Sequence, residues 1–189
     1  MKHPAELFWN AIDLVGSKSL TQLQRYQKRN SPEYIIKFIE IGGGPKMGCL
    51  MENYSRFCFP NLQKREKGLG ETGYDHIIEV NGKKIYIEQK SSGHWGEADY
   101  KWQHVEVQHK WNVLLLCGID YHDIHFWGLS KDMFNQLVIE NKITNQGNKK
   151  NDSSEGMWFN YTDVESRLVK ISDSAELEKF VSLDLISSI

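Results

Sequence analysis

The sequence has no run of 18 apolar residues, and its start, MKHPAELFWN, lacks the basic and then apolar order of a secretory signal peptide. A membrane-spanning helix needs about 20 consecutive apolar residues, so the sequence predicts no transmembrane helix. Because neither the membrane nor the secretory route is indicated, we expect a cytoplasmic protein.

Cysteine is scarce as well. The chain has three cysteines, Cys49, Cys58 and Cys117, and no pair has CxxC spacing. An odd number without metal-ligand spacing argues against a disulfide framework and against a zinc site. Because each cysteine lies among apolar or aromatic neighbours, we expect three buried free thiols.

Neither sign of charge is in large excess, since 23 Lys and Arg stand against 25 Asp and Glu, for a formal net charge of −2. Net charge therefore does not announce a nucleic-acid-binding protein, although local charge is what contacts phosphates. Basic residues do cluster at 28–29, 64–67, 83–84 and 149–150. Each cluster taken alone is typical of a solvated surface.

Aromatic residues, by contrast, are abundant: they make up 12% of the chain, and hydrophobic residues make up 40%. These shares exclude a disordered or fibrous chain. The length of 189 residues suits one domain, and no shift in composition divides it. We expect a helical amino-terminal part at 1–45, a catalytic core at 46–130 and a carboxy-terminal helix, loop and tail at 131–189.

Helical spacing of apolar residues dominates the amino-terminal part. It predicts helices over 4–15, 19–28, 32–40 and 47–59. Between the last two lies the stretch GGGPKMG, at 42–48, which lacks the terminal GK[ST] of a phosphate-binding loop. We therefore interpret this stretch as a flexible turn, and polar glycine-rich segments at 62–73 and 143–156 as loops.

The centre of the chain contains the strongest strand signal. Asn81-Gly82 separates the runs YDHIIEV and KKIYIEQK, and Asn-Gly between strand-like runs indicates a β-hairpin. Beyond the hairpin we expect a loop at 91–100, a helix at 101–111, strands at 112–119 and 123–130, a helix at 130–142, and a short strand and a helix in the tail. This order describes an α/β domain with a mixed sheet flanked by helices.

Three polar residues, Glu88, Gln89 and Lys90, interrupt the second strand of the hairpin. Because successive strand residues point to opposite faces, Glu88 and Lys90 share one face, while Gln89 hydrogen-bonds or packs on the other. The two-residue turn sets a register that brings Asp75 opposite Glu88. Two carboxylates about 5 Å apart repel each other unless a cation lies between them.

Mg²⁺ takes oxygen ligands, usually one or two carboxylates together with waters and a substrate phosphate. The pattern therefore predicts a Mg²⁺ site formed by Asp75 and Glu88, with Mn²⁺ able to substitute. Lys90 would position or help to deprotonate the attacking water and offset the charge on a phosphorane.

The pattern Tyr-Asp, twelve residues, Glu-Gln-Lys, on strand, turn and strand and followed by a helix and a strand, resembles the PD-(D/E)xK nuclease superfamily with its restriction-endonuclease-like fold. The resemblance covers roughly residues 46–130. Asp75, Glu88 and Lys90 match its three core positions, and Tyr74 stands where the name of the motif has Pro.

The resemblance implies a fourth residue and a function. Many members carry a further Glu on the helix before the first strand, and Glu52 lies where that residue would be. The implied function is a Mg²⁺-dependent DNA endonuclease that leaves a 5′-phosphate and a 3′-hydroxyl. It would be a type II restriction enzyme or the cleavage subunit of a heterodimeric one.

The implied partner is double-stranded DNA. A palindromic target would call for a homodimer, and a cutter of one strand would act with a larger recognition subunit. Two alternatives stay open: a repair or junction-resolving nuclease of the same superfamily, which reads DNA shape, and a catalytically inactive DNA-binding module.

Further polar residues lie close to the motif in the sequence. Ser91, Ser92 and His94 follow it directly, and Gln103 and His104 begin the helix expected after the strand. Side chains of these types contact phosphates and base edges, so we expect them to support the metal site or contact DNA.

Two other patterns predict no site. His122 and His125 have a spacing near that of metal ligands, but no Cys or second His pair completes a zinc set. Glu140 and Lys142 repeat the Glu-x-Lys spacing at the end of an expected helix, without a strand around them or an upstream Asp. Only the copy at Glu88 has the context that the chemistry requires.

Overall fold

A mixed β-sheet organises the chain in the computed structural model, which describes residues 20–42, 44–65, 73–95, 99–146 and 156–187. Together with helices it forms a single α/β domain, as the sequence predicts. The helix expected over 4–15 lies outside the described residues. In the described part of the chain, no helix combines the length and apolar character needed to cross a bilayer.

The strands of the sheet follow the hairpin and the buried runs of the sequence. In chain order they are β1 Gln63–Lys64, β2 His76–Val80, β3 Lys83–Trp95, β4 Asp99–Val105, β5 Val113–Ile119, β6 Ile124–Ser130, β7 Thr144–Asn145, β8 Met157–Asn160 and β9 Val169–Ile171. Their order across the sheet is β7-β8-β4-β3-β5-β6-β9, and β2 pairs with β3 and β1. Among the described strands only β3 and β5 run parallel.

The hairpin between β2 and β3 has the predicted turn and register. Val80 pairs with Lys83 and the ladder continues to His76 opposite Ile87. Asn81 has a φ of 52°, the left-handed conformation that a two-residue hairpin turn requires. The strand predicted over 112–119 is also confirmed, since every residue of β5 is buried.

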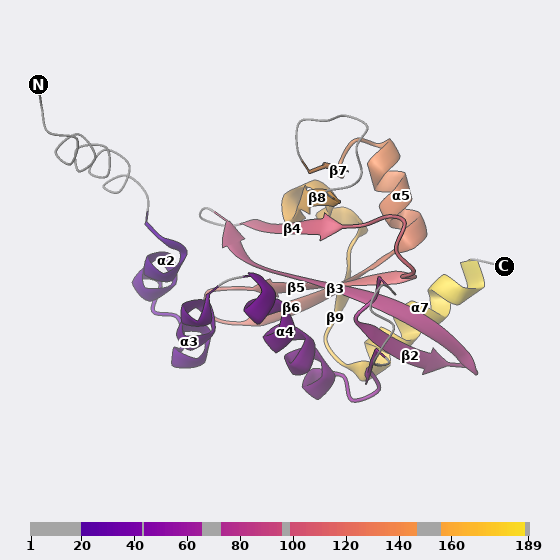
Figure 1. Ribbon diagram of the computed structural model, residues 1–189, viewed down its shortest axis with the longest axis horizontal. Coiled ribbons are helices and arrows are strands. Elements are labelled where there is room, and N and C mark those ends of the chain that lie inside the picture. Colours follow the sequence, from indigo (N-terminus) through magenta and orange to yellow (C-terminus); the bar gives the residue numbers. More distant parts are fainter. Residues whose placement is uncertain (1–19, 43, 66–72, 96–98, 147–155, 188–189) are drawn as a thin grey trace, which may run out of the picture.

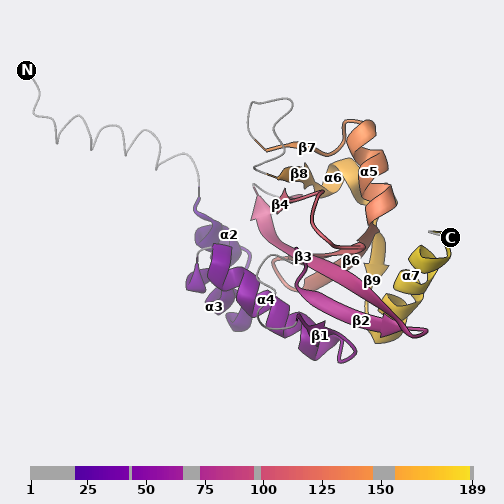
Figure 2. The same cartoon turned by 45° about the vertical axis from the view of Figure 1, so that its right-hand side comes forward.

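Helices cover both faces of the sheet. They are α2 Gln22–Lys28, α3 Glu33–Ile41, α4 Gly44–Cys58, α5 Lys131–Ile139, α6 Tyr161–Val164 and α7 Ser174–Ser187, with the short 3₁₀ helix η2 Glu165–Arg167 after α6. Figures 1 and 2 show α2, α3 and α4 gathered on one side of the central strands β3, β5 and β6, and α5 on the other side, next to β7 and β8 at the end of the sheet. Ser130 caps α5 by accepting a hydrogen bond from the backbone N–H of Met133.

Two hydrophobic cores result, one on each face, because β5 alternates its side chains between them. Leu115 and Cys117 pack with the amino-terminal helices and α7. Leu114 and Leu116 pack with α5, β4 and β8. The two cores thus lie on either side of β5, whose parallel neighbour β3 is the strand that carries Glu88 and Lys90.

Residues 91–111 differ from the prediction. β3 continues through Ser91 to Trp95, and β4 occupies 99–105, where a loop and then a helix were expected. The connection from β3 to its parallel neighbour β5 therefore runs through a strand. This is a departure from the helix that the superfamily resemblance implied at this position.

The reason is a two-residue period with one interruption. Tyr100 and Trp102 are buried and alternate with half-buried neighbours, which is the pattern of a strand. His104 has a φ of 58°, and the pairing of β4 with β8 shifts between Trp102 and Val105. This bulge places Val105 out of phase, so that the apolar spacing resembled that of a helix.

Two smaller predictions also need correction. The turn expected over 42–48 is shorter, because Gly42 ends α3 at a φ of 58° and α4 begins at Gly44. All three cysteines are free, but Cys117 alone is buried, Cys58 is half-buried and Cys49 is exposed. Cys49 lies on the solvent side of α4, away from the apolar stripe that includes the buried Met51.

We predict that Gly118→Ala lowers the free energy of unfolding by about 1 to 3 kcal/mol, the usual cost of overpacking a core. A Cβ atom at Gly118 would lie 2.8 Å from both Trp127 Cζ3 and Tyr100 Cζ. Urea denaturation measures the change. The control is Gly48→Ala in α4, where a Cβ meets nothing within 4 Å and alanine should stabilise the helix. Equal losses in both variants would contradict the packing argument.

Candidate active site

The candidate active site lies where β3 has an open edge. β2 pairs with β3 only as far as Ile87, and β4 pairs with it only from His94. Over the six positions between them, β3 pairs with β5 on its other edge. A cavity of about 780 Å³ lies along this opening. It is lined by Glu52, Asp75, Glu88, Lys90, Ser91, Ser92, Gln103 and His104, which are all the predicted site residues except His94.

Glu88 and Lys90 share a face of β3, as their spacing predicts. The Lys90 ammonium donates a hydrogen bond to Glu88 Oε1 at 2.6 Å, and the two side chains are only 20% and 10% exposed, respectively. Burial raises the pKa of the Glu88 carboxyl, the nearby Asp75 raises it further, and the Lys90 ammonium opposes both effects. The pair is thus a largely buried carboxylate held by one cation.

Asp75 continues the hairpin one residue beyond β2. Its backbone N–H donates to the carbonyl of Ile87 at 2.9 Å. Its Oδ2 atom accepts a hydrogen bond from the backbone N–H of Gln89, also at 2.9 Å. These two bonds hold Asp75 against β3 near Glu88. The paired ladder ends at His76 opposite Ile87, so the predicted pairing of Asp75 with Glu88 is not part of it.

Glu52 reaches the same cavity from α4. The pKa of its carboxyl is raised, first by burial and then by the negative charge of Asp75. Glu52, Asp75 and Glu88 therefore bring three carboxyl groups to one cavity, and the charge of Asp75 disfavours ionisation of the other two. A cation among them would relieve this repulsion.

The donor chemistry fits Mg²⁺. Carboxylate oxygens are its usual protein ligands, and one or two of them suffice because waters and substrate oxygens complete the octahedron. Asp75 and Glu88 meet this requirement, with Glu52 beside them. Among the described residues, no group of three or more His, Cys, Asp and Glu side chains is arranged to hold a metal ion. A Mg²⁺ site with two protein carboxylates needs no third protein ligand, so it is compatible with the absence of such a group among the described residues.

A buried polar chain behind the site was not predicted. Arg56 Nη1 lies 3.2 Å from His76 Nδ1, and His76 Nε2 lies 2.9 Å from Gln89 Oε1. Because a guanidinium only donates, Nδ1 of His76 accepts a hydrogen bond from Arg56, and the N–H at Nε2 donates one to Oε1 of Gln89. Burial lowers the pKa of His76, which agrees with a neutral ring.

This chain holds the backbone that carries the site. His76 follows Asp75 directly, and Gln89 separates Glu88 from Lys90, so a bond between them locks the two strands together. Gln89 forms this hydrogen bond on the face of β3 opposite to Glu88 and Lys90, as predicted, although it also counts among the residues that line the cavity. The available sequence signal for the chain was a polar residue at an inward-facing position on each strand of the hairpin.

The remaining predicted residues reach the cavity in different ways. Ser92 Oγ accepts a hydrogen bond from the backbone N–H of Lys101 at 3.0 Å and so links β3 to β4. Ser91 Oγ lies 3.5 Å from Gln89 Nε2. Gln103 and His104 line the cavity from β4, and the expected position at the start of a helix is wrong for both.

His94 is not brought to this cavity. Its Nε2 atom lies 2.7 Å from Asp120 Oδ1, and its side chain lines a second cavity together with His125. Glu140 and Lys142, the second Glu-x-Lys pair, are 3.9 Å apart on the surface at the end of α5. Of the two Glu-x-Lys pairs, only Glu88 and Lys90 lie in the cavity, as the sequence predicts.

The arrangement can hold a divalent cation, place an ammonium next to it and admit a substrate along the open edge of β3. The ammonium, hydroxyl and amide groups in its lining are of the types that contact a phosphate backbone. No protein-family model and no curated protein matches the chain.

Replacing Gln89 tests the buried chain. We expect Gln89→Met to lower the free energy of unfolding by about 1 to 3 kcal/mol, because the His76 N–H loses its acceptor in a buried place. Chemical denaturation at neutral pH measures the loss. The control Gln103→Met changes a half-buried glutamine in the cavity wall and should cost less than about 0.5 kcal/mol. A loss of the same size in both variants would contradict the role of the chain.

Replacing Glu88 tests the cost of burying its charge. The folded protein keeps the Glu88 proton to a higher pH than the unfolded chain, so wild type loses stability as pH rises through the folded pKa. Glu88→Gln does not titrate, and it should be more stable than wild type at pH 7. This advantage should shrink as the pH falls through the raised pKa of folded Glu88, and it should be lost below about 4.3, the ordinary glutamate pKa.

Thermal unfolding in the presence of a metal chelator, between pH 4 and pH 8, measures this difference. The control Glu140→Gln removes an exposed carboxyl group. An equal pH-dependent gain in the control would assign the effect to net charge and not to the burial of Glu88.

Proposed function

We propose that this chain is a Mg²⁺-dependent DNA endonuclease of the PD-(D/E)xK kind, acting as a type II restriction enzyme or as the cleavage subunit of a heterodimeric one. One observation carries the proposal. The Lys90 ammonium touches Glu88 at 2.6 Å in the cavity where Asp75 is fixed by the backbone of β3. Two carboxylates and one ammonium group thus converge at the open edge of β3.

The roles of the residues follow from their positions. Asp75 and Glu88 would hold Mg²⁺, which when bound supplies an activated water and neutralises charge on the phosphate. Lys90 lies within hydrogen-bonding distance of Glu88 Oε1, so its ammonium can hold the attacking water and stabilise negative charge on the phosphorane. Glu52, opposite on α4, can orient a second water.

The open edge of β3 supports a DNA substrate. Ser91 and Ser92 from β3 and Gln103 from β4 line the same cavity as the carboxylates. Hydroxyl and amide groups of this kind contact phosphate oxygens and fix the register of the duplex. Lys101 also lines this cavity, with its ammonium 3.9 Å from the ring centre of Trp158.

Two other functions would use the same cavity: a repair or junction-resolving nuclease, and a DNA-binding module without activity. The intact set of Asp75, Glu88 and Lys90 favours cleavage over binding alone. Discrete fragments, nicks at distorted DNA, or retention without cutting distinguish the three functions.

We expect wild type to cut unmodified phage and plasmid DNA with Mg²⁺ or Mn²⁺ and to bind it without cutting in Ca²⁺. Lys90→Met should lower the cleavage rate by about 10²-fold to 10³-fold, the usual cost of losing one group that stabilises transition-state charge. Gel electrophoresis and sequencing of the ends measure cleavage and should find 5′-phosphates.

The matched control is Lys142→Met, which removes the lysine of the second Glu-x-Lys pair and should cut as wild type does. Unchanged cleavage by Lys90→Met would contradict the assigned role of Lys90. The absence of any cleavage by wild type with either metal would contradict the proposed nuclease.

A further inference from the structure

A second cavity, of about 350 Å³, lies beyond the point where β3 and β4 meet. Its polar lining residues are Asp120, His94 and His125, and Lys170 of β9 also lines it. None of these has a role in the proposed cleavage. Ligand pockets begin at about 300 Å³, so the space suits one small ring system and not a duplex.

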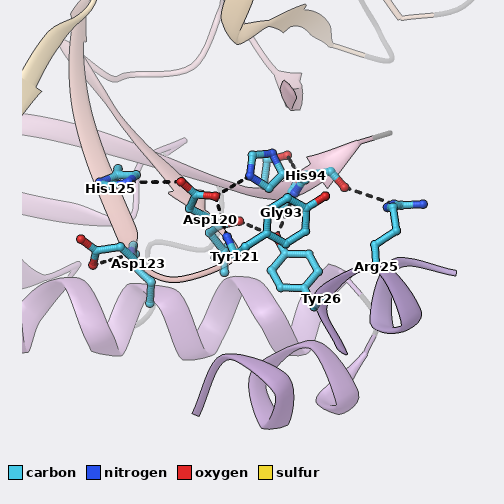
Figure 3. A network of polar contacts seen from close by, with 11 residues as sticks. Arg25, Tyr26, Gly93, His94, Asp120, Tyr121, Asp123 and His125 are labelled. Atoms are coloured by element: carbon cyan, nitrogen blue, oxygen red, sulfur yellow. Dashed lines mark hydrogen bonds and ion pairs between the residues drawn. The ribbon is translucent and has the colours of Figure 1, made fainter. Parts of the chain in front are cut away.

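The polar part of this cavity centres on Asp120, which Figure 3 shows between His94 and His125. Oδ1 of Asp120 accepts from His94 Nε2 at 2.7 Å and from the backbone N–H of Tyr121 at 2.6 Å. Oδ2 is 3.6 Å from His125 Nε2, which exceeds a hydrogen-bond distance. Oδ2 therefore retains capacity to accept a hydrogen bond from a ligand.

The charge of Asp120 is favoured as well. Partial burial would raise the pKa of this carboxyl, but the hydrogen bonds from His94 and Tyr121, together with the nearby His125, hold it below its ordinary value. A metal ion is a poor occupant, because this cluster, like the rest of the described residues, offers no group of three or more His, Cys, Asp and Glu side chains arranged to hold one.

The cluster is held rigidly. His94 is only 6% exposed and stacks on Tyr100, with ring centres 4.7 Å apart and planes 15° apart. The hydroxyl of Tyr26, from α2, accepts a hydrogen bond from the backbone N–H of His94 at 3.0 Å and donates to the carbonyl of Ile119. Figure 3 shows Tyr26 reaching from its helix to this end of the strands.

Aromatic rings form the rest of the wall. Trp127, Tyr100 and Tyr161 contact one another, with ring centres 5.2 to 5.8 Å apart. All three rings line the cavity. Aromatic faces attract planar nitrogen heterocycles, and every nucleobase has such a face.

We propose that this cavity binds a single nucleobase, stacked on the aromatic wall and donating a hydrogen bond from its exocyclic amino group to Oδ2 of Asp120. Adenine, cytosine and guanine carry such a group. Thymine lacks it, and its N3–H is flanked by two carbonyls that the Asp120 carboxylate would repel. The exposed Lys170 can contact the phosphate of the same nucleotide.

The position of the cavity suggests the source of the base, a step that rests on the proposed function. His94 lies four residues beyond Lys90 on the same face of β3, about 13 Å away at a rise of ~3.3 Å per residue. This distance is about four base steps of B-DNA. A stacked base cannot enter so small a space, so the DNA would present a base turned out of its helix.

Binding of deoxynucleoside monophosphates tests the site without requiring cleavage. Titration calorimetry with dAMP, dCMP, dGMP and dTMP, in the absence of divalent metal, should give dTMP the weakest binding by about tenfold. Tyr161→Ala should weaken dCMP binding by about tenfold, because stacking on an aromatic ring is lost. The control Tyr34→Ala removes an exposed ring outside the cavity and should change nothing.

Asp120→Asn provides a sharper test. The asparagine carbonyl can still accept from His94, while its amide nitrogen takes the place of Oδ2 and donates. The discrimination against dTMP should therefore disappear, with dTMP bound more tightly than by wild type, a result that loss of structure would not produce. Absence of binding at millimolar concentrations, equal binding of all four nucleotides, or an unchanged preference in Asp120→Asn would overturn the proposal.

A second measurement identifies the source of the base. Duplexes carrying 2-aminopurine at successive positions are bound in Ca²⁺, and fluorescence should change at one position about four steps from the cut. If nucleotides bind but no position responds, the site serves free nucleotides and the DNA source is overturned. If nucleotides bind but DNA is never cut, the nuclease proposal fails and the base site stands. If DNA is cut but no nucleotide binds, the base site fails alone.

Discussion

The parallel pairing of β3 with β5 is the constraint on which the rest of this structure depends. This pairing places one edge of β3 in the middle of the sheet. The other edge of β3 has no strand partner between the end of β2 and the start of β4. A strand at the centre of a sheet is normally apolar. Glu88 and Lys90 are accommodated in this one because the missing neighbour gives their side chains a cavity instead of a core.

The candidate active site costs the fold stability. Three carboxyl groups share one cavity in which they are partly buried. Burial and the charge of Asp75 raise the pKa values of Glu52 and Glu88, because both disfavour the charged forms. Such an arrangement persists only if the surrounding structure fixes it. The buried hydrogen bond between His76 and Gln89 does this from the opposite face, where it joins the strands that carry Asp75 and Lys90.

The sequence was informative wherever a rule of local geometry applied. The Asn81-Gly82 turn set the hairpin register, and the two-residue period of β3 placed Glu88 beside Lys90. It was misleading where a local irregularity broke the period, as at His104, whose bulge made β4 resemble a helix. The bond from Arg56 to His76 could not be predicted, because it depends on how α4 docks against the hairpin, which no spacing encodes.

Tyr26 joins segments that are far apart along the chain. Its hydroxyl bridges the carbonyl of Ile119, 93 positions away, and the backbone of His94, so α2 closes over the far ends of both parallel strands. A Cβ atom at Gly93 would lie 2.4 Å from Gln22 Nε2 and 3.1 Å from the Tyr26 hydroxyl, so a larger residue there would displace the Gln22 side chain and crowd this hydroxyl. A fragment restricted to residues 46–130 would lose these contacts with α2, and the carboxyl ends of β3 and β5 would be left uncovered and prone to association with other chains.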